Sequence, residues 1–482
     1  MSNVRASIAW SFLSKYLTTI LAFGSVVVLA RLLTPEQIGI YSIAAAFFTI
    51  GQHFRDFGIG SYLIQEKDLT RDKLKSAFAL SIAVCWSLGL LFIVSSSYIS
   101  DFYDRPELDE IFIWLEFCFF IMPFGALPKA MLKREMKFKA MLIVDVSSSV
   151  VHAATGLIAA YLGYGYMSLA WASFAGISTS ILVVLFFRPA SMPWGLGFSE
   201  ITHIAKFGWR ITTSNIAGHL RGVAPELIVG RMFGAPAVAI LGKATSSTNM
   251  FRQLIFQGID NVATPVFAEN NRDGGDPKGP FIFASSCLLA ISWPFFGFMG
   301  LNASEIILFL FGDQWVDAVP LLEVMCLAAM IQTITSFVPT YLVSVGQVGR
   351  MAKLQILFLV TGTTLILLGA MYSLYYVCLA VVLQKVIELY CYSKDMRLAL
   401  KVSSREIVAV LSKVSVITVS AMIGPVAIYA AGEFYQVSIY VVLILGGGLS
   451  LIGWLLAIHL TRHEISDELF KIYRTVGIVK ST

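Results

Sequence analysis

Long apolar runs separated by short polar stretches fill the chain from end to end. A helix that crosses a bilayer needs about 20 mostly apolar residues, because lipid offers no partner for backbone N–H and C=O groups. The runs long enough to do so cover residues 8–30, 38–62, 76–99, 111–131, 141–162, 165–187, 208–230, 236–266, 281–301, 319–343, 353–371, 374–393, 407–430 and 436–460. The pattern predicts an all-α polytopic membrane protein with about 14 transmembrane helices.

Composition supports this assignment. The 482 residues are 57% hydrophobic and 13% charged, and their mean hydropathy is +0.77. Soluble domains carry about 25% charged residues, so an ordinary soluble fold is excluded. The six cysteines all fall within predicted helices and show no CxxC spacing. We therefore expect them to pack as small apolar residues and to hold no metal.

The charges between the helices indicate an orientation. If the N-terminus is cytoplasmic, most Lys and Arg residues fall in cytoplasmic loops and in the tail, and only Arg31, Arg105 and Arg231 fall in outer loops. Such a bias toward cytoplasmic cations is typical of membrane proteins. Both termini are therefore predicted to be cytoplasmic. The net charge of +5 follows from this topology, and we expect no nucleic-acid partner.

Two segments 200 residues apart resemble each other. "ARLLTPEQIGIYSIA" (30–44) aligns without a gap with "GRMFGAPAVAILGKA" (230–244), which pairs Arg31 with Arg231. Six predicted helices separate the two copies, so they would be parallel repeats, although chance similarity between apolar helices is the alternative. The predicted division is an N-terminal lobe (1–187), an amphipathic cytoplasmic connector (188–207), a C-terminal lobe (208–400), and two further helices with a cytoplasmic tail (401–482).

Several segments resemble a known family. They are "ARLLTPEQIGIYSIA" followed by "DFGIGSYLIQ", "KFGWRITTSN…IVGRMFGA" and "LFGDQWVDAVPLL". They resemble the polysaccharide transporters, the Wzx-like lipid-linked oligosaccharide flippases of the multidrug/oligosaccharidyl-lipid/polysaccharide exporter superfamily. The resemblance implies two six-helix lobes around a central cavity and alternating access. It also implies an undecaprenyl-pyrophosphate-linked oligosaccharide substrate, moved across the bacterial inner membrane.

Charged residues within the predicted helices are the candidate site residues, because an ionised side chain at mid-bilayer normally faces protein or water. The helix over 208–230 places Thr212, Asn215, His219, Gly222 and Glu226 on one face. Arg221 lies on a second polar face, where Pro225 should kink the helix. We expect Arg221 to face the cavity and attract the pyrophosphate; pairing with an acid on a neighbouring helix is the alternative.

The helix over 236–266 carries Asn249 and Arg252 on one face, and both are expected to line the cavity; for Arg252, an internal ion pair is the alternative. In the segment 38–62, Arg55 is expected to receive the phosphates, with Asp56 holding it or a neighbouring helix. An early end of that helix, leaving "HFRD" as a solvated turn, is equally open. The predicted substrate-binding residues are Arg221, Arg252, Arg55, Arg210, His219, Asn215 and Asn249.

The energy source and the rival functions follow from what the sequence contains. No GxxxxGK[ST] motif is present, so a cation gradient (H⁺ or Na⁺) or the membrane potential is expected to drive transport, with Glu226 or Asp56 as the coupling carboxylate. No cofactor or metal is predicted, and short outer loops disfavour an enzyme. A multidrug or metabolite exporter and a peptidoglycan precursor flippase are the alternatives. Membrane lipids, and a polysaccharide polymerase with its export machinery, are the expected partners.

Overall fold

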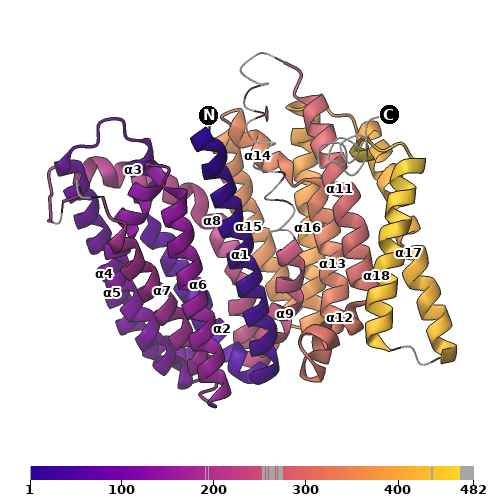
Figure 1. The fold of residues 1–482 in the computed structure, drawn as a ribbon, viewed down its shortest axis with the longest axis horizontal. Coiled ribbons are helices and arrows are strands. Elements are labelled where there is room, and N and C mark those ends of the chain that lie inside the picture. The colour runs from indigo at the N-terminus through magenta and orange to yellow at the C-terminus, as the bar shows by residue number, and fades with distance from the viewer. Residues whose placement is uncertain are drawn as a thin grey trace. The chain divides into compact units, whose positions relative to one another are not determined.

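The computed structural model describes residues 2–189, 192–193, 195–251, 256, 259, 266–267, 269, 275–435 and 438–466. Every regular element in these residues is a helix (Figure 1). Within this described part of the chain, eleven helical stretches are long and apolar enough to cross a membrane. The prediction of a polytopic all-α membrane protein is confirmed.

Three predicted spans are absent from those eleven, namely 38–62, 208–230 and 236–266. They overlap the described helices α2 (Pro35–Asp56), α8 (Ile201–Phe233) and α9 (Ala235–Phe251). All three carry polar side chains along much of their length, which lowers their mean hydropathy. The total of fourteen spans stays a prediction, and part of the third lies outside the described residues.

The chain divides into two compact units, Met1–Ile240 and Leu241–Thr482, with the boundary inside α9. Helix α8, expected to open the second lobe, packs within unit 1 against α2 and α4. It begins at Ile201, inside the predicted connector. The lobe boundaries stay a prediction. The remaining helices of unit 1 are α1 (Ser2–Leu32), α3 (Ile59–Gln65), α4 (Arg71–Tyr103), α5 (Glu107–Arg134), α6 (Phe138–Tyr161) and α7 (Met167–Phe186).

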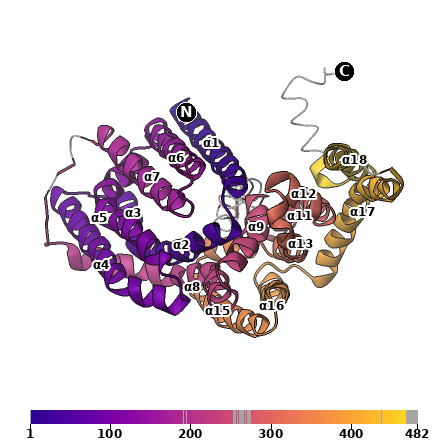
Figure 2. The same cartoon turned by 90° about the horizontal axis from the view of Figure 1, so that it is seen from below.

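Within unit 1, neighbouring helices in sequence pack as antiparallel pairs. Helix α4 packs on α5, α6 packs on α7, and α1 covers α6, as Figure 2 shows in a view along the helices. Large apolar side chains on the outer faces, such as Ile20 on α1 and Phe186 on α7, are exposed. In a bilayer such faces contact lipid, so their exposure in the isolated chain is expected.

The start of α2 explains one of the sequence motifs. Within "TPEQ", the Thr34 hydroxyl accepts a hydrogen bond from the Gln37 backbone N–H at 3.3 Å, and the Gln37 side chain accepts one from the Thr34 N–H at 3.1 Å. Pro35 occupies the first helical turn, where no N–H is needed. This capping box fixes where α2 begins, which makes the motif architectural.

The segment predicted as one helix over 38–62 is divided in two. Helix α2 ends at Asp56, Phe57 has φ 28° and Gly58 has φ 63°, and α3 begins at Ile59. Ile59, Tyr62 and Leu63 of α3 are buried in an apolar cluster with α4 and α5. Apolar periodicity continues across the break, which is why the pattern alone predicted an uninterrupted helix.

Unit 2 is a second bundle in which α11 packs on α13 and α17, and α16 packs on α13 and α15. The segment predicted as a helix over 319–343 is also divided, at Thr335 and Ser336. Besides the rest of α9, the helices are α11 (Lys278–Leu301), α12 (Ala303–Leu310), the 3₁₀ helix η2 (Asp313–Ala318), α13 (Val319–Ile334), α14 (Phe337–Ser344), α15 (Val348–Ala370), α16 (Leu374–Leu398), α17 (Ser404–Tyr435) and α18 (Ile439–Leu460).

The "LFGDQW" segment of unit 2 holds a buried lysine. The Lys243 ammonium of α9 lies 5.0 Å from the centre of the Phe311 ring and 4.9 Å from that of Trp315. All three side chains are buried. Aromatic faces stabilise a desolvated cation, so this segment anchors α9 to η2.

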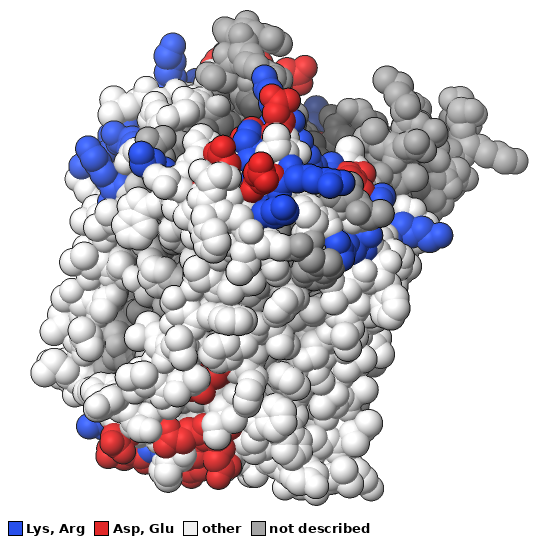
Figure 3. Space-filling view, turned by 90° about the vertical axis from the view of Figure 1, so that its left-hand side faces the viewer, with Lys and Arg blue, Asp and Glu red and all other residues white. Residues whose placement is uncertain are grey.

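Charge is distributed unevenly along the visible face in Figure 3. Lys and Arg gather at its upper end together with some acids, whereas the lower end is mainly acidic. A broad band without visible charge, apart from a small acidic spot near its lower edge, separates the two ends. Such a separation is what a bilayer-spanning orientation requires. The cytoplasmic placement of both termini stays a prediction.

Candidate functional site

Unit 1 contains a cavity of about 670 Å³, lined by residues from α2 to α8. Polar side chains contribute hydroxyl and amide groups to its wall, namely Gln52, Ser61, Ser81, Ser148, Ser180 and Thr212. Along α5 the lining extends from Met122 to Lys133, a length of about 16 Å at 1.5 Å per residue. The cavity is therefore large enough for a phosphorylated sugar head.

The break between α2 and α3 forms part of this wall, because Phe57 and Gly58 line the cavity. Irregular backbone is tolerated at membrane depth only where it is buried in protein or lines a wet cavity. Helix α8 approaches the break closely at Gly208, where an added Cβ would overlap the Phe57 carbonyl oxygen. A glycine at this position lets the two backbones meet.

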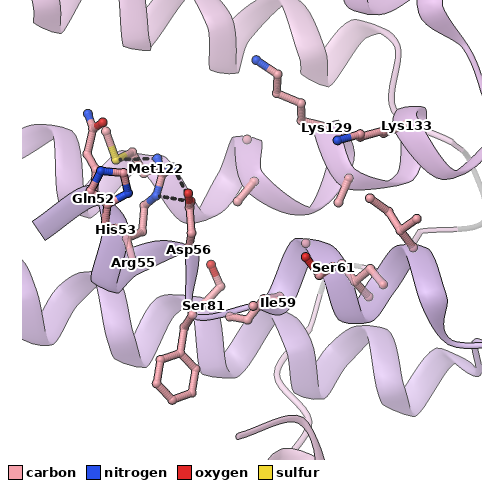
Figure 4. Close-up of a pocket in the computed structure, with 18 of the residues that line it drawn as sticks. Gln52, His53, Arg55, Asp56, Ile59, Ser61, Ser81, Met122, Lys129 and Lys133 are labelled. Carbon is pink, nitrogen blue, oxygen red and sulfur yellow. Dashed lines mark hydrogen bonds and ion pairs between the residues drawn. The ribbon is translucent and has the colours of Figure 1, made fainter. Parts of the chain in front are cut away.

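Arg55 lies at the end of α2 and points into the cavity (Figure 4). Its Nε and Nη2 donate to one Asp56 carboxylate oxygen, at 3.0 and 2.5 Å, and its Nη1 donates to the Met122 sulfur at 3.0 Å. Thioether sulfur is a weak acceptor. Of the two roles considered for Asp56, the structure shows the pairing with Arg55. The segment "HFRD" is the last turn of α2, directly before the break.

Two further cations were missed by the sequence analysis. Lys129 and Lys133 line the cavity from the last turns of α5. Lys129 pairs with Asp145 of α6 at 2.8 Å. The predicted helix over 111–131 contains Lys129 and stops before Lys133, and both lysines counted only toward the cytoplasmic charge; on a continuing helix their i, i+4 spacing places them on one face. That spacing is the signal that could have identified them.

The charges of this cavity are unbalanced. Among the lining residues that the structure describes, Arg55, Lys129 and Lys133 are cationic and Asp56 alone is anionic. Arg55 is matched by Asp56, and Lys129 by Asp145 outside the lining. Lys133 is therefore the cation available to an anionic ligand without breaking an ion pair described in unit 1.

Helix α8 presents one of its two predicted polar faces to the cavity. Thr212, Ile216 and His219, spaced at i, i+4 and i+7, are lining residues. The His219 ring stacks on that of His53 from α2, with centroids 3.3 Å apart. Arg221 and Glu226 are partly buried and do not line this cavity. Their predicted roles, and the role of His219 in binding, stay predictions.

Asn249 lines a separate pocket inside unit 2, of about 100 Å³. Lys385, the cation of that wall, pairs with Glu388 at 3.1 Å. The Ser292 hydroxyl is fully buried and has no hydrogen-bond partner among the residues described. The other polar groups of the wall are uncharged, namely Thr245, Thr248, Gln332, Thr333 and Ser336.

Three predicted site residues cannot be placed. Arg252 lies outside the described residues, and for Arg210 and Asn215 the structure describes the helical backbone of α8 but no side chain. Their assignment to a substrate cavity stays a prediction. Similarity to known proteins gives independent information about the family and the fold of this chain.

Residues 28–320 match the family model described as "Polysaccharide biosynthesis protein". The chain is 23% identical to the teichuronic acid biosynthesis protein TuaB of Bacillus subtilis, over 69% of each chain. It is 21% identical to the lipopolysaccharide biosynthesis protein WzxC of Escherichia coli, over 72% of this chain and 71% of that one. It is 24% identical to the succinoglycan biosynthesis transport protein ExoT of Rhizobium meliloti, over 72% of this chain and 70% of that one.

Solved structures share the fold at low identity. The lipid II flippase MurJ in an inward closed conformation matches 98% of this chain and 99% of its own, with a TM-score of 0.74 and 15% identity. An inward-facing multidrug resistance MATE family transporter of the MOP superfamily matches 80% of this chain and 96% of its own, with a TM-score of 0.61 and 15% identity. The family model spans more than half of the chain, so this protein belongs to the polysaccharide biosynthesis protein family, as its resemblance to the polysaccharide transporters predicted.

Proposed function

We propose that the protein is a flippase for undecaprenyl-pyrophosphate-linked oligosaccharide repeat units. It moves them across the bacterial inner membrane, from the cytoplasmic to the outer leaflet, for exopolysaccharide, capsule or O-antigen assembly. The observation that carries the proposal is the cationic excess of the unit 1 cavity. A pyrophosphate head needs compensating cations to cross a hydrocarbon layer about 30 Å thick.

The side chains of the cavity suit both parts of such a head. Arg55 offers a planar, permanently charged guanidinium, and Lys133 offers a mobile ammonium, for the phosphate oxygens. Serine and threonine hydroxyls of the same wall suit sugar hydroxyls. The names of TuaB, WzxC and ExoT refer to the biosynthesis of teichuronic acid, lipopolysaccharide and succinoglycan, which supports a polysaccharide substrate.

The pocket of unit 2 supports recognition of the sugar. Its wall combines uncharged hydroxyl and amide groups with the rings of Phe256 and Phe296. Hydroxyls that donate to their own helix backbone, such as those of Thr245 and Thr333, keep oxygen lone pairs for a ligand's O–H groups. We assign this pocket to neutral sugar rings.

Transport follows alternating access, driven by a cation gradient or by the membrane potential. Export of a doubly negative head is favoured by an inside-negative potential at about 2.3 kcal/mol per charge per 100 mV. Asp56 and Glu226 are the candidate coupling carboxylates. A polysaccharide polymerase would receive the flipped repeat units.

The experiment deletes the gene in its host and restores it with chosen variants. The proposal expects the deletion to abolish surface polysaccharide while lipid-linked repeat units accumulate in the inner leaflet. Wild type should restore export, whereas the double variant Lys129→Ala/Lys133→Ala should not. The matched double variant Lys137→Ala/Lys139→Ala removes the same charge outside the cavity and should restore it. Unchanged glycan with altered drug sensitivity would favour the multidrug exporter.

A peptidoglycan precursor flippase is the second candidate, because the likeness to the lipid II flippase covers 98% of the chain. The two functions share the lipid pyrophosphate and differ in the sugar-peptide head. Restored growth of cells depleted of their own lipid II flippase would favour this candidate. Failure to restore growth, with polysaccharide lost on deletion, supports the oligosaccharide flippase.

A further inference from the structure

Two imidazole rings join α2 to α8 inside the unit 1 cavity. The rings of His53 and His219 lie face to face, with centroids 3.3 Å apart and planes inclined by 15°. Both residues line the cavity, so cavity water can reach them. The two stacked imidazoles are therefore titratable groups in direct contact within a candidate anion site.

The pair can hold at most one proton near neutral pH. An imidazole without perturbing neighbours has a pKa of about 6.5, so its charge changes in the physiological range. Two imidazolium ions at this separation would repel each other strongly. Stacking of one imidazolium on one neutral ring remains favourable, as for other cations over aromatic faces.

Among the described residues, a small number of charged groups surround the pair. Asp56 and Arg55 act electrostatically on His53, and Asp56 acts on His219. From α5, Lys129 and Lys133 line the same cavity. Asp56 is bound to Arg55, so the surroundings of the empty cavity are cationic and disfavour a further proton. A bound diphosphate reverses this balance.

We propose that the His53–His219 pair is a proton-dependent anion contact, neutral in the empty cavity and singly protonated when a diphosphate binds. The proton comes from the buffered solvent by way of the cavity and adds to one ring nitrogen, the buffer becomes its conjugate base, and no bond within the ligand changes. The proposal rests on the proposed function and specifies how the same site adjusts its charge. The site gains a cation only while its ligand is present.

Proton uptake and anion binding are then reciprocally linked. The affinity for a diphosphate should fall as pH rises, by at most about tenfold per pH unit, because one proton is involved. The affinity should stop changing with pH once the pH is low enough for the ligand-free pair to carry its proton already. A cavity charged only by arginine and lysine would bind the same ligand without such a dependence near neutral pH.

Calorimetry measures this linkage directly. The purified full-length protein in lipid nanodiscs is titrated with farnesyl diphospho-N-acetylglucosamine, a diphosphate diester whose own charge is constant near neutral pH. Titrations at one pH in buffers of different ionisation enthalpy give the number of protons taken up. Wild type should take up a substantial fraction of one proton per ligand, and its affinity should depend on pH.

The informative variant is His53→Phe/His219→Phe, which keeps two stacked rings and removes the protonation sites. It should bind the probe with no proton uptake and a pH-independent affinity. The control is His203→Phe, which removes an imidazole of α8 that does not line the cavity and should behave as wild type. Thermal unfolding checks that each variant is folded, and if this double variant is not, His53→Gln/His219→Gln takes its place, because two amide side chains also cannot titrate.

The outcomes separate this proposal from the function on which it rests. Binding by wild type without proton uptake, or undiminished uptake in the double variant, overturns the His53–His219 proposal and leaves the flippase standing. Absence of binding by every folded form, wild type included, overturns both. Uptake that is lost only when both rings are replaced supports a shared proton.

Discussion

The cavity of unit 1 and the pocket of unit 2 are both enclosed by helices of a membrane bundle, but their walls differ in chemistry. The first contains three cations, one acid and a break in the helix. The second offers hydroxyls and amides, and its lysine is paired with Glu388. Among the described residues, the cations that could meet an anionic ligand therefore line the unit 1 cavity, whereas the unit 2 pocket presents mainly uncharged polar groups.

The physical reason for separating the two chemistries is the cost of desolvation. A cation at membrane depth is stable beside water, an acid or an anionic ligand, and the larger cavity supplies room for all three. Neutral hydroxyls need only local partners and tolerate a smaller space. Each prediction below tests one side of this contrast against a matched change, beginning with the largest expected effect.

Removal of a cavity cation should have the largest effect. Arg55→Ala should weaken binding of a lipid-linked oligosaccharide by about 10- to 100-fold, because a charge-assisted hydrogen bond contributes about 1.5–3 kcal/mol. Asp56→Asn should instead strengthen binding of the same ligand, since it releases the Arg55 guanidinium from its ion pair. Binding to the purified protein checks both variants. An equal loss of affinity in Arg55→Ala and Asp56→Asn would contradict the proposal that Arg55 binds the anionic head.

The close approach of α8 to the break in unit 1 should be the next most sensitive feature. Gly208→Ala should lower the free energy of unfolding by about 1–3 kcal/mol, because the new Cβ overlaps the Phe57 carbonyl oxygen. Gly222→Ala on the same helix is the control, since nothing lies within 4 Å of a Cβ there. Thermal unfolding in detergent distinguishes them. Equal stability of the two variants would show that the break does not depend on α8.

In unit 2, removal of one buried hydroxyl should weaken sugar binding without lowering the stability of the protein. Ser292→Ala deletes a polar atom that has no described partner, so the protein should be as stable as wild type or more stable by about 1 kcal/mol. Binding of the sugar head should weaken a fewfold. Ser285→Ala removes another buried, unpartnered hydroxyl that does not line this pocket, so it should leave sugar binding unchanged.

The smallest effect concerns an imidazole in a dry setting. After the end of α18, His463 is buried, accepts a hydrogen bond from the Ile465 N–H and donates one to the Ser286 hydroxyl at 2.9 Å. Burial lowers the pKa of His463 below its usual value. The unfolded chain therefore binds a proton that the folded chain does not, and stability should fall as pH drops below about 6.5.

The measurement for this last prediction is thermal unfolding at pH 7.5 and 5.5. His463→Gln should reduce the difference between the two pH values, because its side chain does not titrate. An unchanged difference would assign the pH dependence to other groups. The contrast with His53 and His219, whose rings face a water-lined cavity, would then rest on the ligand-binding measurements alone.

Much of the fold follows from the apolar pattern, because lipid imposes length and composition on each spanning helix. The pattern is weakest where the site is. Helices α2 and α8 are too polar to be recognised as spans by composition, the described part of α9 has 17 residues, and these three helices line the two cavities. Their existence was predicted from the sequence, since apolar residues still outnumber polar ones along them.

Other parts of the site depend on contacts between distant residues. Periodicity does not reveal the left-handed backbone at Phe57, which requires the glycine of α8 opposite. Lys129 and Lys133 resemble loop cations until the extent of α5 is known. Conversely, Thr212 and His219 belong to a polar face predicted from helical spacing alone and line the cavity, whereas Glu226 of the same predicted face does not.

Besides its apolar contacts, the short helix α3 is held to α5 by the hydrogen bonds of one side chain. The Arg134 guanidinium donates to the carbonyl oxygens of Leu63 and Glu66, at 2.6 and 2.5 Å, and to that of Lys67 at 3.3 Å. Displacement of α3 alone would leave these carbonyls without their donor, so the wall carrying Ser61 and the wall carrying Lys133 must shift together. A glycan that enters this cavity therefore meets α3 and α5 as a single wall.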